Sequence, residues 1–223
     1  MKIKLVIFDM DGTLLDTLQD LACTTNELLR AHGYPEYPVK DYCYFVGSGI
    51  RILIERVLPE KERVEPTLTR LCSEFVVRYE QHKEKHTAPY PGIGTLLQAL
   101  QKQGILLAIA SNKVHEAMQP LVEHYFPGID FAAIRGNRQG IPVKPHPAIV
   151  ENILQMTRCT ATEALYVGDT AIDMQTAAAA GIRKIGVTWG FRPVEELENA
   201  GADFIANTPT DILSFICKNI ENE

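Results

Sequence analysis

The sequence predicts an α/β fold in which a parallel sheet carries helices on both faces and a small all-helical cap follows the first strand. Short apolar runs alternate with amphipathic stretches over most of the chain, which is typical of a parallel sheet built from repeated strand–helix units. The apolar runs are continuous rather than alternating, and this indicates strands buried on both faces. One long stretch near the N-terminus breaks the rhythm, so we expect two structural units.

Six apolar runs are interpreted as the strands of the sheet. They span residues 3–8, 105–110, 131–134, 165–167, 185–187 and 204–206. Amphipathic segments predict the flanking helices at residues 95–103, 114–125, 147–156, 174–180 and 210–219. These elements predict a Rossmann-like core formed by residues 1–16 and 89–223.

Residues 17–88 lack a convincing strand pattern and are expected to form the cap. The first cap helix is expected to begin at Thr17, an N-cap residue with Asp20 three positions later, and to end at Gly33. Two more helices are expected within residues 49–58 and 66–86. The linker HTAPYPGI, which contains proline and glycine, then returns the chain to the core.

Composition and charge narrow the class of protein. The 223 residues are 46% hydrophobic and 22% charged, with a formal net charge of -6, which argues against a nucleic-acid partner because such domains cluster basic residues. The five cysteines are scattered, odd in number and never spaced as C-x-x-C, which predicts free thiols in a reducing compartment. The apolar runs are too short for a membrane span or a signal peptide, so we expect a cytoplasmic protein with no membrane partner.

Two carboxylates, Asp9 and Asp11, come directly after the first predicted strand. Alternate side chains of an extended chain point the same way, and ligands of parallel α/β sheets bind at the carboxyl ends of the strands. Such a pair suits a hard divalent cation, or a nucleophile beside a general acid or base. Gly12 adds backbone freedom at this point. From these residues alone, a polar loop without function is the alternative.

Three later motifs place polar side chains after other strands. The stretch YVGDTAID repeats the pattern, with Asp169 at the strand end and Asp173 one helical turn later. In IASNK, Ser111 and Asn112 are expected to end a strand at a helix start, where a hydroxyl, an amide and free N–H groups bind anions. In PVKPHP, prolines stiffen the backbone at Lys144, whose charge can neutralise carboxylates or phosphate. Helix capping and a solvated loop lysine are the alternative interpretations.

Taken in order, the segments DMDGTLLDT, SNK, VKPHP and GDTAIDM resemble the four motifs of the haloacid dehalogenase-like phosphohydrolases. The resemblance covers essentially the whole chain, including the helical insert, which is similar to the small cap of that superfamily. It implies a Mg²⁺-dependent phosphatase that works through an aspartyl-phosphate intermediate. It also implies a small phosphorylated metabolite as partner, and we expect a monomer or homodimer.

The resemblance implies roles for the four acidic residues. Asp9 matches the nucleophile that attacks phosphorus, and Asp11 matches the acid that protonates the leaving oxygen and then activates water. Mg²⁺ would be held by Asp9, by the backbone carbonyl of Asp11 and by Asp169, with Asp173 acting through water or through contacts with the ligands. These roles suit phosphoryl transfer, which depends on charge neutralisation and in-line placement.

The remaining motif residues are implied to bind the phosphoryl group. Ser111 matches the residue that contacts the transferring oxygens, with Asn112 nearby. Lys144 matches the lysine that binds both the phosphoryl group and the nucleophile. Gly12 and Thr13, from the loop after the first strand, are expected to help bind the substrate.

The cap stretch FVGSGIRILIERVL resembles that of phosphoglycolate phosphatases, in which a Gly-x-Gly loop opens a cap helix. Gly47 and Gly49 fit this loop, whose N–H groups are expected to meet a second anionic group, and Arg51 is expected to pair with a carboxylate. The resemblance therefore implies a small carboxylated phosphate ester. Arg51 as a solvated surface residue is the alternative. A pyrophosphatase, nucleotidase or sugar-phosphate phosphatase or mutase of the same superfamily remains open, as does a phosphate-binding regulatory module without catalysis.

Overall fold

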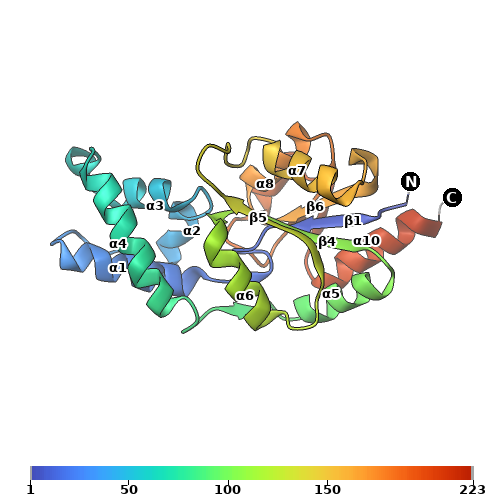
Figure 1. Ribbon diagram of the computed structural model, residues 1–223, viewed down its shortest axis with the longest axis horizontal. Coiled ribbons are helices and arrows are strands. Elements are labelled where there is room, and N and C mark those ends of the chain that lie inside the picture. Colours follow the sequence, from blue (N-terminus) through green and yellow to red (C-terminus); the bar gives the residue numbers. More distant parts are fainter. Residues whose placement is uncertain (1, 222–223) are drawn as a thin grey trace.

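The computed structural model describes residues 2–221. Its main sheet has six parallel strands in the order β5-β4-β1-β6-β7-β8 (Figure 1). The strands are β1 (Leu5–Phe8), β4 (Leu106–Val114), β5 (Phe131–Asn137), β6 (Ala164–Gly168), β7 (Arg183–Val187) and β8 (Phe204–Ala206). β1 is a central strand buried on both faces, as its unbroken apolar run predicts.

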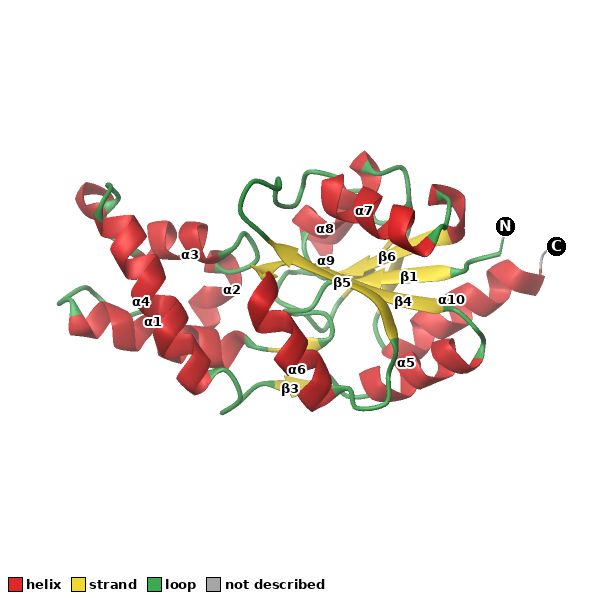
Figure 2. Cartoon of the chain, in the orientation of Figure 1, coloured by secondary structure: helices red, strands yellow, loops and turns green. Residues whose placement is uncertain are grey.

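Helices cover both faces of the sheet, and the predicted fold class is confirmed (Figure 2). One face carries α5 (Ile93–Lys102), α6 (Met118–Tyr125) and α10 (Pro209–Glu221), and the other carries α7 (Ala148–Thr157) and α8 (Ala171–Ala179). A short helix, α9 (Val194–Asn199), lies beside α8 and was not predicted. Each face encloses its own apolar cluster, so the core is a three-layer α/β/α unit.

The cap contains α1 (Leu18–Ala31), α2 (Tyr42–Phe45), α3 (Ile50–Val57) and α4 (Thr67–His82). These helices lie beyond one end of the sheet and pack around a separate apolar cluster that includes Leu28, Leu53 and Phe75 (Figure 1). We propose that residues 17–88 form a cap domain and that residues 1–16 and 89–223 form the core.

Two short antiparallel strands, β2 (Leu15–Asp16) and β3 (Ala88–Pro89), join the cap to the core. The Asp20 carboxylate accepts hydrogen bonds from the backbone N–H groups of His86 and Thr87, and so ties the outgoing chain to the returning one. Thr17 is the N-cap residue of α1, as expected, but its side chain makes no cap bond, and Asp20 bonds to the return linker instead. In the part of the chain that the structure describes, no helix has both the length and the hydropathy to cross a membrane.

The strand that carries Ser111 and Asn112 differs from the expectation. β4 continues to Val114 and pairs with β5 through a register shift between Ala110 and Val114, so these two residues do not lie at a helix start. The extension rests on the pairing of Val114 with Asn137. The Asn112 side chain bonds the Lys144 loop, since its Oδ1 accepts from the Lys144 N–H at 2.9 Å and its Nδ2 donates to the Lys144 carbonyl at 3.2 Å. Helical structure begins only with a 3₁₀ turn, His115–Ala117.

Candidate active site

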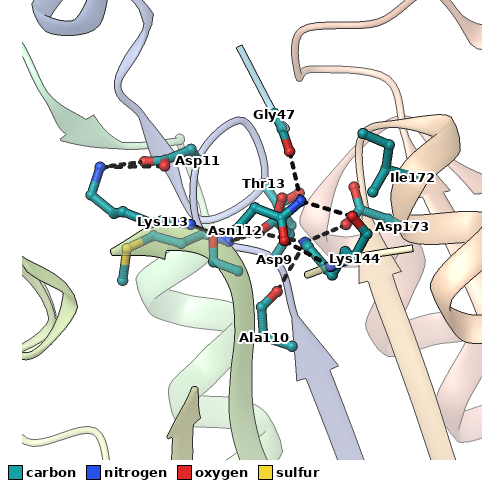
Figure 3. A network of polar contacts seen from close by, with 12 residues as sticks. Asp9, Asp11, Thr13, Gly47, Ala110, Asn112, Lys113, Lys144, Ile172 and Asp173 are labelled. Atoms are coloured by element: carbon teal, nitrogen blue, oxygen red, sulfur yellow. Dashed lines mark hydrogen bonds and ion pairs between the residues drawn. The ribbon is translucent and has the colours of Figure 1, made fainter. Parts of the chain in front are cut away.

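The carboxyl ends of β1, β4 and β6 meet at one edge of the sheet, and the acidic motifs converge there (Figure 3). Three buried carboxylates, those of Asp9, Asp169 and Asp173, each offer an oxygen within 4.8 Å of the others. Burial raises the pKa of Asp9 to about 7, although Lys144 opposes the shift. Burial also raises the pKa of Asp169 well above its usual range, with Asp173 and Asp9 adding to the effect. Several buried carboxylates sharing one site suit a hard cation.

Lys144 supplies the positive charge inside this cluster. Its Nζ lies 2.7 Å from Asp173 Oδ1 and 3.0 Å from Asp9 Oδ1, and it also contacts the Ala110 carbonyl and the Tyr166 hydroxyl. Burial works against its charge, but the carboxylates of Asp173 and Asp9 outweigh burial and hold its pKa well above the usual value. One ammonium among three carboxylates leaves negative charge uncompensated, so the donor set fits a divalent metal ion.

Asp9 presents its two oxygens differently. Oδ1 accepts hydrogen bonds from the Met10 N–H at 2.7 Å and from Lys144, whereas Oδ2 accepts none from the described residues. The Asp9 side chain lines the cavity described below. One oxygen is therefore fixed in place and the other is free to attack a ligand.

Close backbone approaches hold Asp169 in position. A Cβ atom on Gly12 would lie 2.3 Å from Asp169 Oδ2, and one on Gly190 would lie 2.2 Å from Asp169 Cβ, so neither position has room for a side chain. Asp169 Oδ1 accepts from the Thr13 hydroxyl at 3.0 Å, and Oδ2 accepts from the Phe191 N–H at 2.8 Å. Thr13 and Gly12 therefore hold the Asp169 carboxylate in place, and their expected contact with the substrate stays a prediction.

The loop after β7 was missed by sequence reasoning. Phe191 bonds Asp169, and the Trp189 indole N–H donates to the Thr13 carbonyl at 3.1 Å, which fixes the loop after β1. The only signal in the sequence is a glycine between two aromatic residues directly after a predicted strand, TWGF. That pattern indicates a tight backbone approach but not what is approached.

A cavity of about 370 Å³ opens between the cap and the core above the carboxylates. Asp9, Asp11, Ser111 and Asn112 line its core end. The cap side is mostly apolar and comes from α1, α3 and α4, with Gly47 and Gly49 in the loop before α3; its apolar lining residues include Leu21, Ile50, Leu53 and Phe75. The cavity is therefore a mainly apolar chamber with most of its charged groups at the core end and Glu80 of α4 on the cap side.

Asn112 and the glycine loop connect the two units. The Asn112 Nδ2 donates to the Gly47 carbonyl at 3.1 Å, in addition to its bonds with the Lys144 backbone. Both ends of this amide are thus occupied by backbone groups and hold the Lys144 backbone in place, and the expected contact of Asn112 with substrate stays a prediction. Gly47 offers a carbonyl here, and Gly49 precedes α3 with a φ of 87°.

Arg51 does not reach this chamber, which corrects its expected role. Its Nη2 pairs with Glu65 Oε1 at 2.5 Å on the surface, where both side chains are more than half exposed. Arg51 is absent from the lining, whereas its neighbour Ile50 and the residue one turn later, Leu53, are part of it. A helix turns by about 100° per residue, and this step points Arg51 away from the core.

Two residues without an assigned role, Lys113 and Tyr79, lie at the mouth of the site. Lys113 Nζ contacts both Asp11 oxygens, at 3.1 and 3.3 Å, and donates to the Tyr79 hydroxyl at 2.9 Å. Burial opposes the ammonium charge, but Asp11 outweighs it and raises the pKa of Lys113. Burial raises the pKa of Tyr79 to about 12. The lysine lies within the quoted SNK segment, but its partner Tyr79 is in the cap, and nothing in the sequence links the two.

Comparisons with known proteins agree with this geometry. A family model described as haloacid dehalogenase-like hydrolase matches residues 6–187. The chain is 33% identical to a phosphoglycolate phosphatase of Vibrio cholerae, over 96% of this chain and 97% of the relative. It is 30% identical to a phosphoglycolate phosphatase of Aquifex aeolicus, over 97% of this chain and 98% of the relative. A crystal structure from Lactobacillus delbrueckii subsp. bulgaricus, assigned as a phosphoglycolate phosphatase, is similar with a TM-score of 0.91, 34% identity and coverage of 97% and 99%.

Proposed function

The chain belongs to the haloacid dehalogenase-like hydrolase family and is a phosphatase, and from that premise we propose that it hydrolyses a small phosphate monoester through an aspartyl phosphate on Asp9. The observation that carries this proposal is the asymmetry of Asp9, whose Oδ1 is held by Lys144 and Met10 while Oδ2 has no described partner. A nucleophile that is fixed through one oxygen and free at the other is already oriented for in-line attack.

The reaction is proposed to occur in two displacements. Asp9 Oδ2 attacks phosphorus, the bond from phosphorus to the ester oxygen breaks, and Asp11 gives its proton to that oxygen. Asp11 then takes a proton from a water molecule, whose oxygen attacks phosphorus and displaces Asp9. Inorganic phosphate leaves, and both carboxylates return to their starting states.

We propose Mg²⁺ as the ion of this site. Asp9, Asp169 and the backbone carbonyl of Asp11 would hold it, and Asp173 would act next to them through its contact with Lys144. When bound, the ion would offset the carboxylate and phosphoryl charges, which lets Asp9 approach an anion. Lys144 and Ser111 are proposed to bind the phosphoryl oxygens from the protein side.

Phosphoglycolate is the proposed substrate, because the similar proteins above carry that name. The lining of the chamber supports a small leaving group with few charges, since Glu80 and Glu116 contribute acidic groups there. Those carboxylates disfavour the multiply charged leaving groups of pyrophosphate or a nucleoside diphosphate. The apolar wall likewise offers few partners for the hydroxyls of a sugar phosphate.

Phosphate release tests the proposal. The purified protein is assayed with phosphoglycolate, p-nitrophenyl phosphate, pyrophosphate, AMP and glucose 6-phosphate, in EDTA and then in Mg²⁺. We expect Mg²⁺-dependent release, highest for phosphoglycolate by kcat/KM, and its loss in Asp9→Asn. The exposed Asp130→Asn serves as the matched control and is expected to retain activity. Turnover by a sequence-verified Asp9→Asn protein would refute the assignment of the nucleophile.

A further inference from the structure

Lys113 is the one cation among the described residues that line the chamber. Its side chain is 6% exposed and extends from β4 toward Asp11. Figure 3 shows Asp11 and Lys113 meeting on one side of Asp9, with Lys144 and Asp173 on the other. An anionic group of a substrate that lies on the Asp11 side of the chamber therefore finds its positive charge at Lys113, because Lys144 lies on the other side of Asp9 and is not part of the lining.

Tyr79 retains an unused hydrogen-bond donor beside the charge of Lys113. The three N–H donors of the Lys113 ammonium face three acceptors, the two Asp11 oxygens and the Tyr79 oxygen, so Asp11 takes two of its contacts. The Tyr79 oxygen accepts from Lys113, while its own O–H donates to none of the described residues. Both groups line the chamber. A second carboxylate can therefore accept the Tyr79 O–H, and it can share the Lys113 ammonium with Asp11 when Asp11 keeps one of its two contacts.

The position of this donor pair suits the leaving group of the proposed reaction. Asp11 is proposed to protonate the ester oxygen, and Lys113 Nζ lies 3.1 Å from Asp11 Oδ1. In phosphoglycolate the carboxylate carbon is two bonds from that same ester oxygen. We propose that Lys113 and Tyr79 bind the carboxylate of the leaving group and so select a carboxylated phosphate ester. This inference rests on the proposed function and names the residues that set its substrate.

The rest of the lining explains why such a pair is needed. The cap side is apolar apart from the carboxylate of Glu80, and Glu116 adds a second carboxylate from the core side. Moving a carboxylate from water into such a chamber is costly unless a cation with free donors meets it. Arg51, the residue expected from the sequence to play this role, is on the surface with Glu65. Tyr79 comes from α4, so the selecting pair needs both the cap and the core.

The test compares two substrates that differ in one group. Phosphoglycolate carries a carboxylate where 2-hydroxyethyl phosphate carries a neutral CH₂OH, and both present the same ester oxygen. The ratio of their kcat/KM values measures selection for the carboxylate. We expect Tyr79→Phe to lower this ratio roughly 10-fold and Lys113→Met to lower it roughly 100-fold, on the scale of hydrogen bonds to charged groups. Lys113→Arg, which keeps the charge, is expected to recover part of the ratio.

Tyr42→Phe is the matched control, since it also removes a buried cap hydroxyl, one that bonds Asn26 in the interior of the cap. The ratio should be unchanged in this variant. If Lys113 serves only to position Asp11, both substrates lose the same factor, the ratio stays constant and the inference is overturned.

Equilibrium binding provides a second measurement that does not depend on turnover. In an Asp9→Asn background, adding Tyr79→Phe should weaken phosphoglycolate binding roughly 10-fold and leave 2-hydroxyethyl phosphate binding unchanged. Equal weakening of both ligands would refute the inference. A failure of the proposed function gives a different result. The wild-type protein would then release no phosphate from phosphoglycolate, 2-hydroxyethyl phosphate or p-nitrophenyl phosphate.

Discussion

Replacing Lys144 with methionine removes the ammonium that joins two buried carboxylates. Its Nζ lies 3.0 Å from Asp9 and 2.7 Å from Asp173, and its side chain is 1% exposed. Methionine keeps most of the side-chain volume, so the change removes charge without creating a large cavity. Breaking a buried pair by removing one partner costs about 3–5 kcal/mol, because an uncompensated charge stays behind.

Proton uptake can relieve part of this cost. The pKa of Asp9 is already raised to about 7, chiefly by burial, and the loss of Lys144 removes the main group that opposes the shift. Below pH 6 the variant can therefore keep Asp9 neutral, and a neutral carboxyl needs no ammonium. In metal-free buffer we expect Lys144→Met to lose about 3 kcal/mol of unfolding free energy at pH 8 and about 1 kcal/mol at pH 5.5.

Urea denaturation at the two pH values, in EDTA, measures both losses. Lys4→Met is the control, since Lys4 pairs with Glu163 on the surface and its side chain is 57% exposed. That variant should leave the unfolding free energy close to the wild-type value at both pH values, because solvent screens an exposed ion pair. An equal loss at both pH values for Lys144→Met, or a loss below about 1 kcal/mol at pH 8, would contradict this account of the charge balance.

Three other predictions concern the metal site and the cap. A methyl group at Gly190 would lie 2.2 Å from Asp169 Cβ. Gly190→Ala should therefore raise the Mg²⁺ concentration for half-maximal activity at least ~10-fold and leave the circular dichroism spectrum unchanged. A wild-type Mg²⁺ response would count against the role of Asp169. The raised pKa of Asp9, from 3.8 to about 7, means that the metal-free folded state binds more protons than the unfolded chain. The unfolding free energy of the metal-free protein should then fall by up to about 4 kcal/mol between pH 4 and 7. An unfolding free energy in EDTA that does not change over this range would contradict the raised pKa of Asp9. Arg51→Ala should leave the KM for phosphoglycolate within about 2-fold of the wild-type value, because Arg51 pairs with Glu65 on the surface. A roughly 10-fold rise in KM would show that Arg51 contacts the substrate.

The fold and the core motifs could be predicted from the sequence because both depend on local patterns. Continuous apolar runs identify buried strands, and polar residues directly after them must lie at the carboxyl edge of a parallel sheet. Asp9, Ser111 and Asp169 meet there for that reason. The extension of β4 to Val114 could not be predicted, since it depends on pairing with Asn137 of β5 across a register shift.

The roles of the cap residues were harder to predict because they depend on which face of a helix points inward. Arg51 follows a residue of the chamber wall by one position, and 100° of helical rotation takes it to the surface. The apolar spacing of Ile50, Leu53 and Val57 contains this information, and a closer use of periodicity would have placed Arg51 outside. Tyr79 gives no comparable signal, since an aromatic residue on an apolar helix face is normally part of a core.

The two carboxylates of the first motif differ in what balances their charge. Asp9 is balanced by Lys144, which the core residues Ala110, Tyr166 and Asp173 hold in place. Asp11 is balanced by Lys113, and that lysine also contacts the cap through the hydroxyl and the ring face of Tyr79. A substitution at Tyr79 therefore changes the surroundings of Asp11 without touching those of Asp9. The side chains around the proposed nucleophile thus come from the core, and the cap reaches them only through the bond from Asn112 to the Gly47 carbonyl. The lysine beside the proposed acid–base group contacts a cap side chain directly.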